Sequence, residues 1–251
     1  SSINSQEELH ARFGGVVPEI ACRAHIETLM PMLDNVLEHA ELGREQIEAV
    51  AATTHPGLIG ALLIGLTTAK SLAWAWQKPL VGVNHVEAHI YASWLDEPEP
   101  ELPAVSLVAS GGHTNLFLTE SITSHRLLGT TTDDAAGEAF DKVASILKLG
   151  YPGGPKIEKA AGHGDPEAVD FPRTWIDSED DNFSFSGVKT AVLYHCLGKN
   201  TSKRELEMVE YEPPFVADVA ASFQEAVVDV LVAKTIRAAE REQVRSVILG
   251  G

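Results

Sequence analysis

Two histidines four residues apart are the clearest chemical signal in this sequence. His85 and His89 lie in the segment 84–89 (NHVEAH), directly after a short apolar run. Residues i and i+4 share one face of a helix, which is the spacing that two imidazoles need to bind one metal ion. Many surface histidines have the same spacing. Spacing alone therefore leaves both a metal site and a plain helical surface open.

Glu87 invites a zinc-protease interpretation, which the spacing excludes. A helical zinc protease carries its glutamate directly after the first histidine, beside the metal. Glu87 lies two residues from each histidine, about 200° around the helix, so it points away from both. Asn84 and Glu87 instead have the spacing of an N-cap and a capping box. We expect them to begin the helix that carries the histidines.

A glycine turn at 110–114 (SGGHT) is a candidate anion site. Adjacent glycines let the main chain approach an anion and direct N–H groups towards it, as a phosphate site requires. An ordinary glycine hairpin turn has the same residues, and the turn by itself favours that simpler interpretation.

Three further segments place polar groups at the starts of helices. In 133–142 (DDAAGEAFDK), Asp133 or Asp134 is a natural N-cap, whereas Asp141 lies inside the helix and either binds ribose hydroxyls or pairs with Lys142. The segment 151–155 (YPGGP) is a glycine loop that opens a helix and offers main-chain donors suited to a nucleotide. The segment 183–190 (FSFSGVKT) brings hydroxyls and a lysine to a helix start, with capping as the alternative.

Helices and strands alternate in the first part of the sequence, which is typical of parallel strands in an α/β fold. Apolar residues recur at helical spacing from Ile20 to Leu37, and Gly43 ends that helix. The expected elements are a helix at 18–41, a strand at 49–54, a helix at 60–76, a strand at 79–83 and a helix at 85–95.

The second part begins anew with an antiparallel meander and continues with helices. The last long helix carries apolar residues from Val219 to Leu231 on one face. The sequence therefore predicts two similar lobes. The expected elements are strands at 104–109, 115–119 and 126–130, helices at 135–149, 155–161, 187–197 and 216–240, and a strand at 246–249.

Composition limits the class of protein. The formal net charge is −17, although proteins that bind nucleic acid by themselves usually have a basic surface. We interpret the acidic runs 96–101 and 177–181 as solvated surface, so any RNA contact must come from a local basic patch or a partner protein.

Cys22 and Cys196 are too few for a disulfide framework, which favours a reducing cytoplasm. No stretch reaches the ~18 uninterrupted apolar residues of a membrane span, and the front of the chain has no basic region leading into an apolar signal segment.

The order of these segments resembles that of the TsaD family of tRNA N6-adenosine threonylcarbamoyltransferases. The resemblance covers essentially the whole chain and implies the two-lobed actin/sugar-kinase/Hsp70-like (ASKHA) fold, with a first lobe at 1–100 and a second at 101–251, truncated at both ends. The segments that carry it are 14–19 (GGVVPE), 56–62 (PGLIGAL), 85–89, 110–114, 133–142, 151–155 and 183–190.

The resemblance also implies an activity and a set of site residues. The family transfers the threonylcarbamoyl group of threonylcarbamoyl-AMP to N6 of the adenosine just 3′ of the anticodon, in tRNAs that read codons beginning with A. It implies one divalent metal ion, Fe2+ or Zn2+, and an adenylate substrate (threonylcarbamoyl-AMP or ATP). It also implies TsaB-like and TsaE-like partners in the cytoplasm.

The resemblance also assigns roles to individual residues. By motif, His85 and His89 are the metal ligands. Val108, Ala109, Ser110, Gly111 and Gly112 form the adenylate loop, and Asp141 and Gly154 are further nucleotide contacts.

Departures from the family pattern set an expectation for the chain by itself. The family's first strand, its third metal ligand (an aspartate) and an asparagine beyond Gly250 are absent from this sequence, and His55 stands where the family usually has glycine. We expect the 251-residue chain alone to be inactive, and no residue here identifies itself as a general base.

Three other functions share this type of domain. One is an O-carbamoyltransferase or the carbamoyl-transfer domain of a hydrogenase maturation factor. The second is a sugar kinase or ATPase, which needs no histidine pair. The third is a non-catalytic TsaB-like partner, which lacks the histidine pair, so His85 and His89 argue against it.

Overall fold

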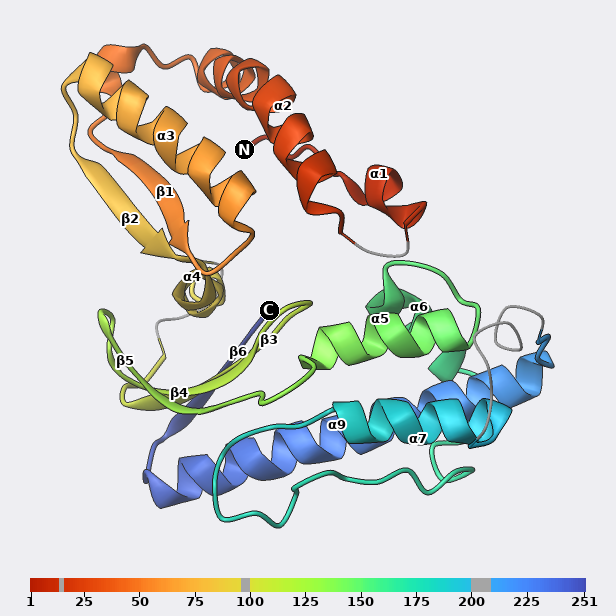
Figure 1. Cartoon of the computed structure of the whole chain (residues 1–251). Coiled ribbons are helices and arrows are strands. Elements are labelled where there is room, and N and C mark those ends of the chain that lie inside the picture. Colours follow the sequence, from red (N-terminus) through yellow and green to blue (C-terminus); the bar gives the residue numbers. More distant parts are fainter. Residues whose placement is uncertain (14–15, 96–99, 200–208) are drawn as a thin grey trace. The chain divides into compact units, whose positions relative to one another are not determined.

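The computed structural model describes residues 1–13, 16–95, 100–199 and 209–251 (Figure 1). Gly14 and Gly15 of the first family segment, and residues 96–99 of the acidic loop, lie outside the described residues. The chain divides into two compact units, Ser1–Ala88 and His89–Gly251.

Unit 1 is built on two parallel strands, as the alternation of helices and strands predicted. β1 (Val50–His55) pairs with β2 (Leu80–Asn84), from Val50 beside Leu80 to Thr53 beside Val83. The crossover helix α3 (Ile59–Trp76) packs on β1 and on α2 (Pro18–His39), whose first residue is the proline that favours a helix start. The short helices α1 (Glu7–Ala11) and η1 (Arg44–Gln46) complete the unit.

Helix α3 modifies the expectation of no membrane span. By length and composition it is apolar enough to cross a membrane, with a mean hydropathy of 1.3 over 18 residues. In the structure it is the crossover between β1 and β2, and it buries Ala69 and Ala73 while Ile59 and Trp74 are exposed. One such helix is weak grounds for a membrane protein, because core helices meet the same criteria.

Unit 2 contains a four-stranded sheet in the order β5-β4-β3-β6. The predicted meander is confirmed. It consists of β3 (Ala104–Ala109), β4 (Thr114–Ser121) and β5 (Ser124–Thr130), and β4 runs antiparallel to both β3 and β5. β6 (Ser246–Gly250) lies parallel to β3, with Val108 beside Gly250. The carboxyl ends of β3 and β6 therefore meet at one edge of the sheet.

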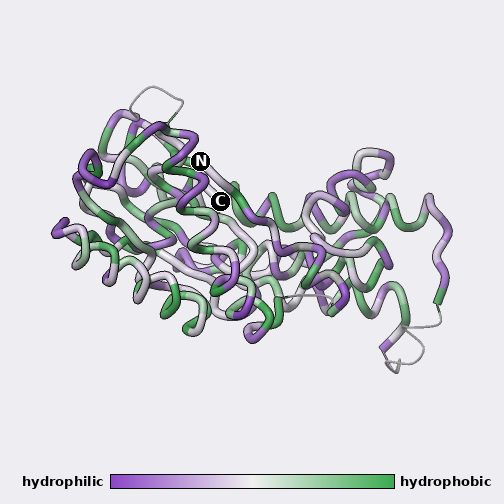
Figure 2. Tube along the Cα trace, turned by 90° about the horizontal axis from the view of Figure 1, so that it is seen from above, coloured by the Kyte–Doolittle hydropathy of each residue, from purple (hydrophilic) through white to green (hydrophobic). Residues whose placement is uncertain are grey.

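Four helices share a core with this sheet. They are α5 (Ala136–Ile146), α6 (Gly153–Ala161), α7 (Ser186–Leu197) and α9 (Pro213–Arg241). Helix α9 packs against β3 and β6, α6 and α7 pack on α9, and α5 packs on α6 and α7. Val105, Leu107 and Leu116 of the sheet join these helices in one buried apolar cluster, and Figure 2 shows apolar and polar residues alternating along the helices as green and purple bands. α5 ends three residues earlier than predicted, because Lys148 adopts a left-handed backbone with φ 62°. The helix predicted at 216–240 begins at Pro213, another proline in the first turn.

The acidic run 177–181 is not simply solvated surface, so that prediction was wrong for part of the run. Asp181 is 4% exposed, and its two oxygens accept bonds from both terminal nitrogens of Arg241, at 3.0 and 2.5 Å. Lys234, which is 0% exposed, donates to Ser178 Oγ at 2.7 Å and to the carbonyl of Asp180 at 3.0 Å. Arg237 donates to the carbonyl of Ile176 at 3.0 Å.

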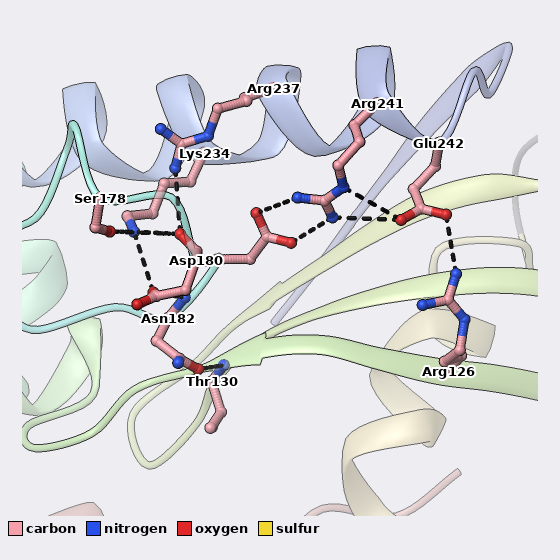
Figure 3. Close-up of polar contacts among 10 residues, drawn as sticks. Arg126, Thr130, Ser178, Asp180, Asn182, Lys234, Arg237, Arg241 and Glu242 are labelled. Atoms are coloured by element: carbon pink, nitrogen blue, oxygen red, sulfur yellow. Dashed lines mark hydrogen bonds and ion pairs between the residues drawn. The ribbon is translucent and has the colours of Figure 1, made fainter.

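These three cations lie at positions i, i+3 and i+7 on one side of α9 and hold the loop at 176–182 against the helix (Figure 3). At the end of this loop, the side-chain oxygen of Asn182 accepts a bond from the main-chain N–H of Thr130 at 3.1 Å. The acidic loop is therefore tied to both α9 and the end of β5. Burial lowers the pKa of Lys234, although the charge of Asp180 partly offsets that effect.

The buried Asp181–Arg241 pair yields a stability prediction. Asp181→Ala removes the acceptor of a bidentate pair, and we expect the free energy of unfolding to fall by about 2–3 kcal/mol. The half-exposed guanidinium of Arg241 can regain water, so the loss stays below that for a fully buried pair. Urea unfolding measures it.

The exposed pair of Arg44 and Glu45 is the matched control for this prediction. Glu45→Ala also removes one partner of an ion pair, but both side chains lie in solvent, so we expect no measurable change. Equal effects of the two substitutions would show that burial does not strengthen the Asp181 pair.

Candidate functional site

The helix with the two histidines begins as the sequence predicted. α4 (His85–Ala92) follows Asn84, whose side-chain oxygen accepts bonds from the N–H groups of Val86 at 2.9 Å and Glu87 at 3.5 Å. The Asn84 amide donates to the Glu87 carboxylate at 3.0 Å, so Glu87 closes onto the Asn84 side chain rather than onto the main chain. Glu87 is therefore occupied in the helix start. His85 and His89 are both half-buried on α4.

In unit 2, the main chain of His89 lies against the carboxyl end of β6. A Cβ atom on Gly250 would lie 2.5 Å from the carbonyl oxygen of His89, so only glycine fits there. Ser93, one turn after His89, donates to the carbonyl of Leu249 at 2.7 Å. These contacts place His89 at the sheet edge where β3 and β6 end, which is where open α/β sheets bind ligands.

A second set of bonds fixes α4 through Tyr91. Its hydroxyl donates to the carbonyl of Ile122 at 2.6 Å and contacts Nε2 of His125 at 3.0 Å. Because the phenol proton is used on Ile122, Nε2 must carry the proton that His125 shares with Tyr91. In the neutral ring, Nδ1 then accepts from Thr119 Oγ1 at 3.1 Å.

The chain of bonds ends on the neighbouring strand, where Thr119 contacts Ser106 Oγ at 2.7 Å and both residues are fully buried. Sequence reasoning missed this network. The only sign of it in the sequence is that Ser106 and Thr119 are polar residues within otherwise apolar, buried strands.

The glycine turn lies against the start of α5. Gly137 donates its N–H to the carbonyl of Ser110 at 3.2 Å, and a Cβ atom on Gly137 would lie 2.5 Å from that oxygen. Thr114 is buried and accepts the N–H of Ala136 at 2.8 Å. The first and last residues of the turn are therefore both fixed to the start of α5.

The other side of the turn is open. A Cβ atom placed on Gly111 or Gly112 would meet no atom within 4 Å, and the same holds for Gly154 at the start of α6. The main chain at these three glycines can be reached by a ligand. Val108 differs from the other loop residues, because its side chain is 0% exposed inside the sheet. β3 is paired on both sides, with β4 and with β6, so the main chain of Val108 is covered as well.

Asp141 joins α5 to α6. Its carboxylate accepts the N–H of Gly153 at 2.7 Å. Lys142 is occupied elsewhere, with Asp134 at 2.6 Å and Glu138 at 2.8 Å, so the predicted alternative of an Asp141–Lys142 pair is wrong. Burial raises the pKa of Asp141 and the charge of Glu138 adds to this, against the lowering effect of the Gly153 bond. A carboxylate with a raised pKa beside an open glycine helix start is typical of a functional site.

Asp133 and Asp134 do not cap α5, contrary to the sequence prediction. Asp133 accepts bonds from Ser184 Oγ at 2.6 Å and from the N–H groups of Phe185 at 2.9 Å and Ser186 at 3.2 Å. These bonds tie the start of α5 to the start of α7.

Asp134 reinforces the same connection by binding Lys142 and also Lys189 of α7, the latter at 2.7 Å. Burial by itself would raise the pKa of Asp134. The bonds to Lys142 and Lys189 outweigh that effect and hold the pKa below its usual range. The segments 133–142, 151–155 and 183–190 are thus connected within unit 2.

The described residues contain no complete metal site. No three side chains of His, Cys, Asp or Glu come together for a metal within residues 1–13, 16–95, 100–199 and 209–251. Two imidazoles on one helix are a donor set that Fe2+ and Zn2+ both accept.

Asp141 and Asp134 have pKa values shifted in opposite directions, which predicts opposite effects of Asp-to-Asn substitution. Because the folded state raises the pKa of Asp141, this residue costs stability once the pH rises above the ordinary value of 3.8. Asp141→Asn keeps an acceptor for Gly153, so we expect this variant to be at least as stable as wild type at pH 7. Its advantage should shrink as the pH falls towards 3.8.

Asp134→Asn is the paired control. The lowered pKa of Asp134 contributes stability above pH 3.8 that is lost as the pH falls through the folded value, so Asp134→Asn should destabilise the protein at pH 7. Urea midpoints at pH 7 and pH 4.5 measure both effects. An equal loss of stability in the two variants at pH 7 would contradict the assignment for Asp141.

Comparison with known proteins gives one consistent family. The family model described as TsaD, tRNA N6-adenosine threonylcarbamoyltransferase, matches residues 1–251. Proteins of that name from Moorella thermoacetica and Symbiobacterium thermophilum are 52% and 51% identical, over 99% and 100% of this chain and 70% and 71% of their own lengths. Among solved structures, YeaZ from Pseudomonas aeruginosa matches 41% of this chain and 50% of its own, at 18% identity and a TM-score of 0.32. A TM-score of that size does not establish a shared fold.

Proposed function

The chain belongs to the TsaD family, and we propose that it forms the nucleotide-binding and metal-binding core of a tRNA N6-adenosine threonylcarbamoyltransferase. The observation that carries this proposal is the family match over residues 1–251 at about 50% identity. The family match sets aside the carbamoyltransferase, sugar-kinase and TsaB-like alternatives.

We further propose the two-lobed ASKHA fold, with lobes at 1–100 and 101–251. The α/β architecture supports it, with a parallel pair in one unit and a meander with helices in the other. The structural division at Ala88 and His89 falls within α4, a little before the boundary proposed from sequence. Truncation at both ends stays a prediction.

The adenylate is proposed to lie along the open side of the glycine turn. The loop of Val108, Ala109, Ser110, Gly111 and Gly112 would carry it, with the open main chain at Gly111 and Gly112 towards the ligand. N–H groups at the start of α6, including Gly154, suit its phosphate. Asp141 would accept a ribose hydroxyl. The open space at Gly111, Gly112 and Gly154 supports this placement.

The metal ion, Fe2+ or Zn2+, would be held by His85 and His89. When bound, it supplies a Lewis acid that polarises an oxygen of the substrate. The protein's own part is to hold the ligands, because Tyr91, Ser93 and the close approach at Gly250 fix the helix on the sheet.

In the reaction, N6 of adenosine forms a bond to the carbamoyl carbon. The bond from that carbon to the phosphate oxygen breaks, AMP leaves with the electron pair, and N6 gives up one proton to solvent. Main-chain N–H groups at the glycine turn would stabilise charge that develops on the carbonyl oxygen. TsaB-like and TsaE-like proteins are the proposed partners, tRNA is the acceptor, and the cytoplasm is the proposed location.

The double substitution His85→Ala/His89→Ala tests the metal site. Introduced into the full-length protein, the double substitution is expected to abolish metal binding and to slow threonylcarbamoyl transfer to tRNA at least about 100-fold, because both histidine ligands are gone. Elemental analysis and transfer assays with the partner proteins measure the two effects. The exposed His39→Ala is the control, and equal metal in the double variant and wild type would refute the assignment.

Tyr91→Phe tests how α4 is positioned. Removing one hydroxyl breaks the bonds to Ile122 and His125, and we expect metal affinity to fall roughly tenfold, as for other groups that orient ligands. Competition with a chromophoric chelator measures the metal Kd. Tyr194→Phe removes an exposed hydroxyl as control. An unchanged Kd in Tyr91→Phe would mean that Ser93 and Gly250 suffice to hold the helix.

A further inference from the structure

Most cations of unit 2 are already occupied by acids of the same unit. The residues paired with acidic side chains are Arg126, Lys142, Arg173, Lys189, Lys234, Arg241 and Arg245. Arg237 binds carbonyl oxygens of the loop at 176–182. Besides Arg237, the cations in no ion pair within the part of unit 2 that the structure describes are Lys148, Lys156, Lys159 and Lys199.

Two of these lysines border one groove. Lys156, Lys159 and His163 are exposed residues along α6 and its end, and they rim a groove of about 520 Å³. Among the described acids next to lining residues in the sequence, none lines the groove: Glu158, Glu210, Glu212 and Asp218. Its remaining lining is apolar or aromatic: Leu147, Leu149, Ala160, Tyr211, Pro213, Val216 and Ala217.

Tyr211 gives the groove an aromatic wall. Its ring stacks on Phe215 with centroids 5.6 Å apart, and His195 stacks on the same Phe215 at 5.6 Å. Burial raises the pKa of Tyr211 to about 12, with Cys196 beside it adding to the shift, so the phenol is neutral at every physiological pH. An existing stack of rings that ends at a groove is a surface on which a further planar group can stack.

We propose that this groove binds a single-stranded stretch of the tRNA substrate, with phosphates on Lys156 and Lys159 and a base against Tyr211. The inference rests on the proposed function, which makes tRNA the acceptor. Unpaired lysines beside a stacking aromatic are the combination that binds single-stranded RNA. An acidic protein segment would satisfy the lysines but would leave the aromatic wall without a planar partner.

The groove is also close to the proposed nucleotide site. Both lie along α6, which begins at Gly153, the residue that donates to Asp141. At 1.5 Å per residue, Lys156 and Lys159 lie about 4.5 and about 9 Å further along the helix axis. RNA held there would place neighbouring nucleotides near the adenylate.

Salt-dependent binding of an unmodified tRNA transcript tests the proposal. Fluorescence anisotropy at several KCl concentrations gives Kd and its salt dependence for the chain and for Lys156→Gln/Lys159→Gln. We expect the variant to bind at least tenfold more weakly and the slope of log Kd against log salt to fall by about 1.5, since each lost phosphate contact removes roughly 0.7–0.9. Tyr211→Leu should weaken binding without changing the slope, and Tyr211→Phe should bind as wild type does.

Arg23→Gln/Lys70→Gln is the matched control, because it removes the same charge from exposed residues of unit 1. Thermal unfolding confirms that each variant is folded. The proposal is overturned if wild type binds no tRNA, if the groove variant keeps its Kd and slope, or if the control loses as much affinity. It is also overturned if the groove variant loses binding to polyglutamate but not to tRNA. The metal assignment is tested separately, by elemental analysis of His85→Ala/His89→Ala, so its failure leaves this tRNA-binding test intact.

Discussion

Close contact between main-chain segments at two glycines is the constraint on which the candidate site depends. At Gly137 the start of α5 touches the turn after β3, and at Gly250 the end of β6 touches the main chain of His89. A side chain at either position would have to displace a carbonyl oxygen, because real Cβ atoms do not approach oxygen so closely. These two contacts bring a histidine of α4 and the glycine turn to one edge of one sheet.

Carboxylates then connect the helices around that edge. Asp133 and Asp134 tie α5 to α7, and Asp141 ties α5 to α6. Of these, Asp141 is the one whose carboxylate the fold disfavours, because burial raises its pKa without a cation beside it. A half-buried carboxylate with a raised pKa, next to glycines with open space around them, is typical of a binding site.

Local patterns were predictable from the sequence, and long-range polar contacts were not. The helix start at Asn84, the parallel pair and the β3–β5 meander follow from capping, periodicity and turn residues that are close together in the chain. Asp133 was predicted to cap its own helix, yet its partners lie about fifty residues away at Ser184 to Ser186. The partner of Asp181 is 60 residues away and those of Tyr91 are 31 and 34 residues away, and one sequence gives no means of pairing them.

The net charge of −17 illustrates the same limit in the function. A net charge does not show which charged side chains are free to meet a ligand. Arg241 and Lys189, for example, are paired with Asp181 and Asp134 of the same unit. What an RNA phosphate meets is set by the few lysines left unpaired and by where they lie. An acidic chain can still present a local basic patch, and here two of those lysines, Lys156 and Lys159, lie on α6, the helix that begins at the proposed nucleotide site.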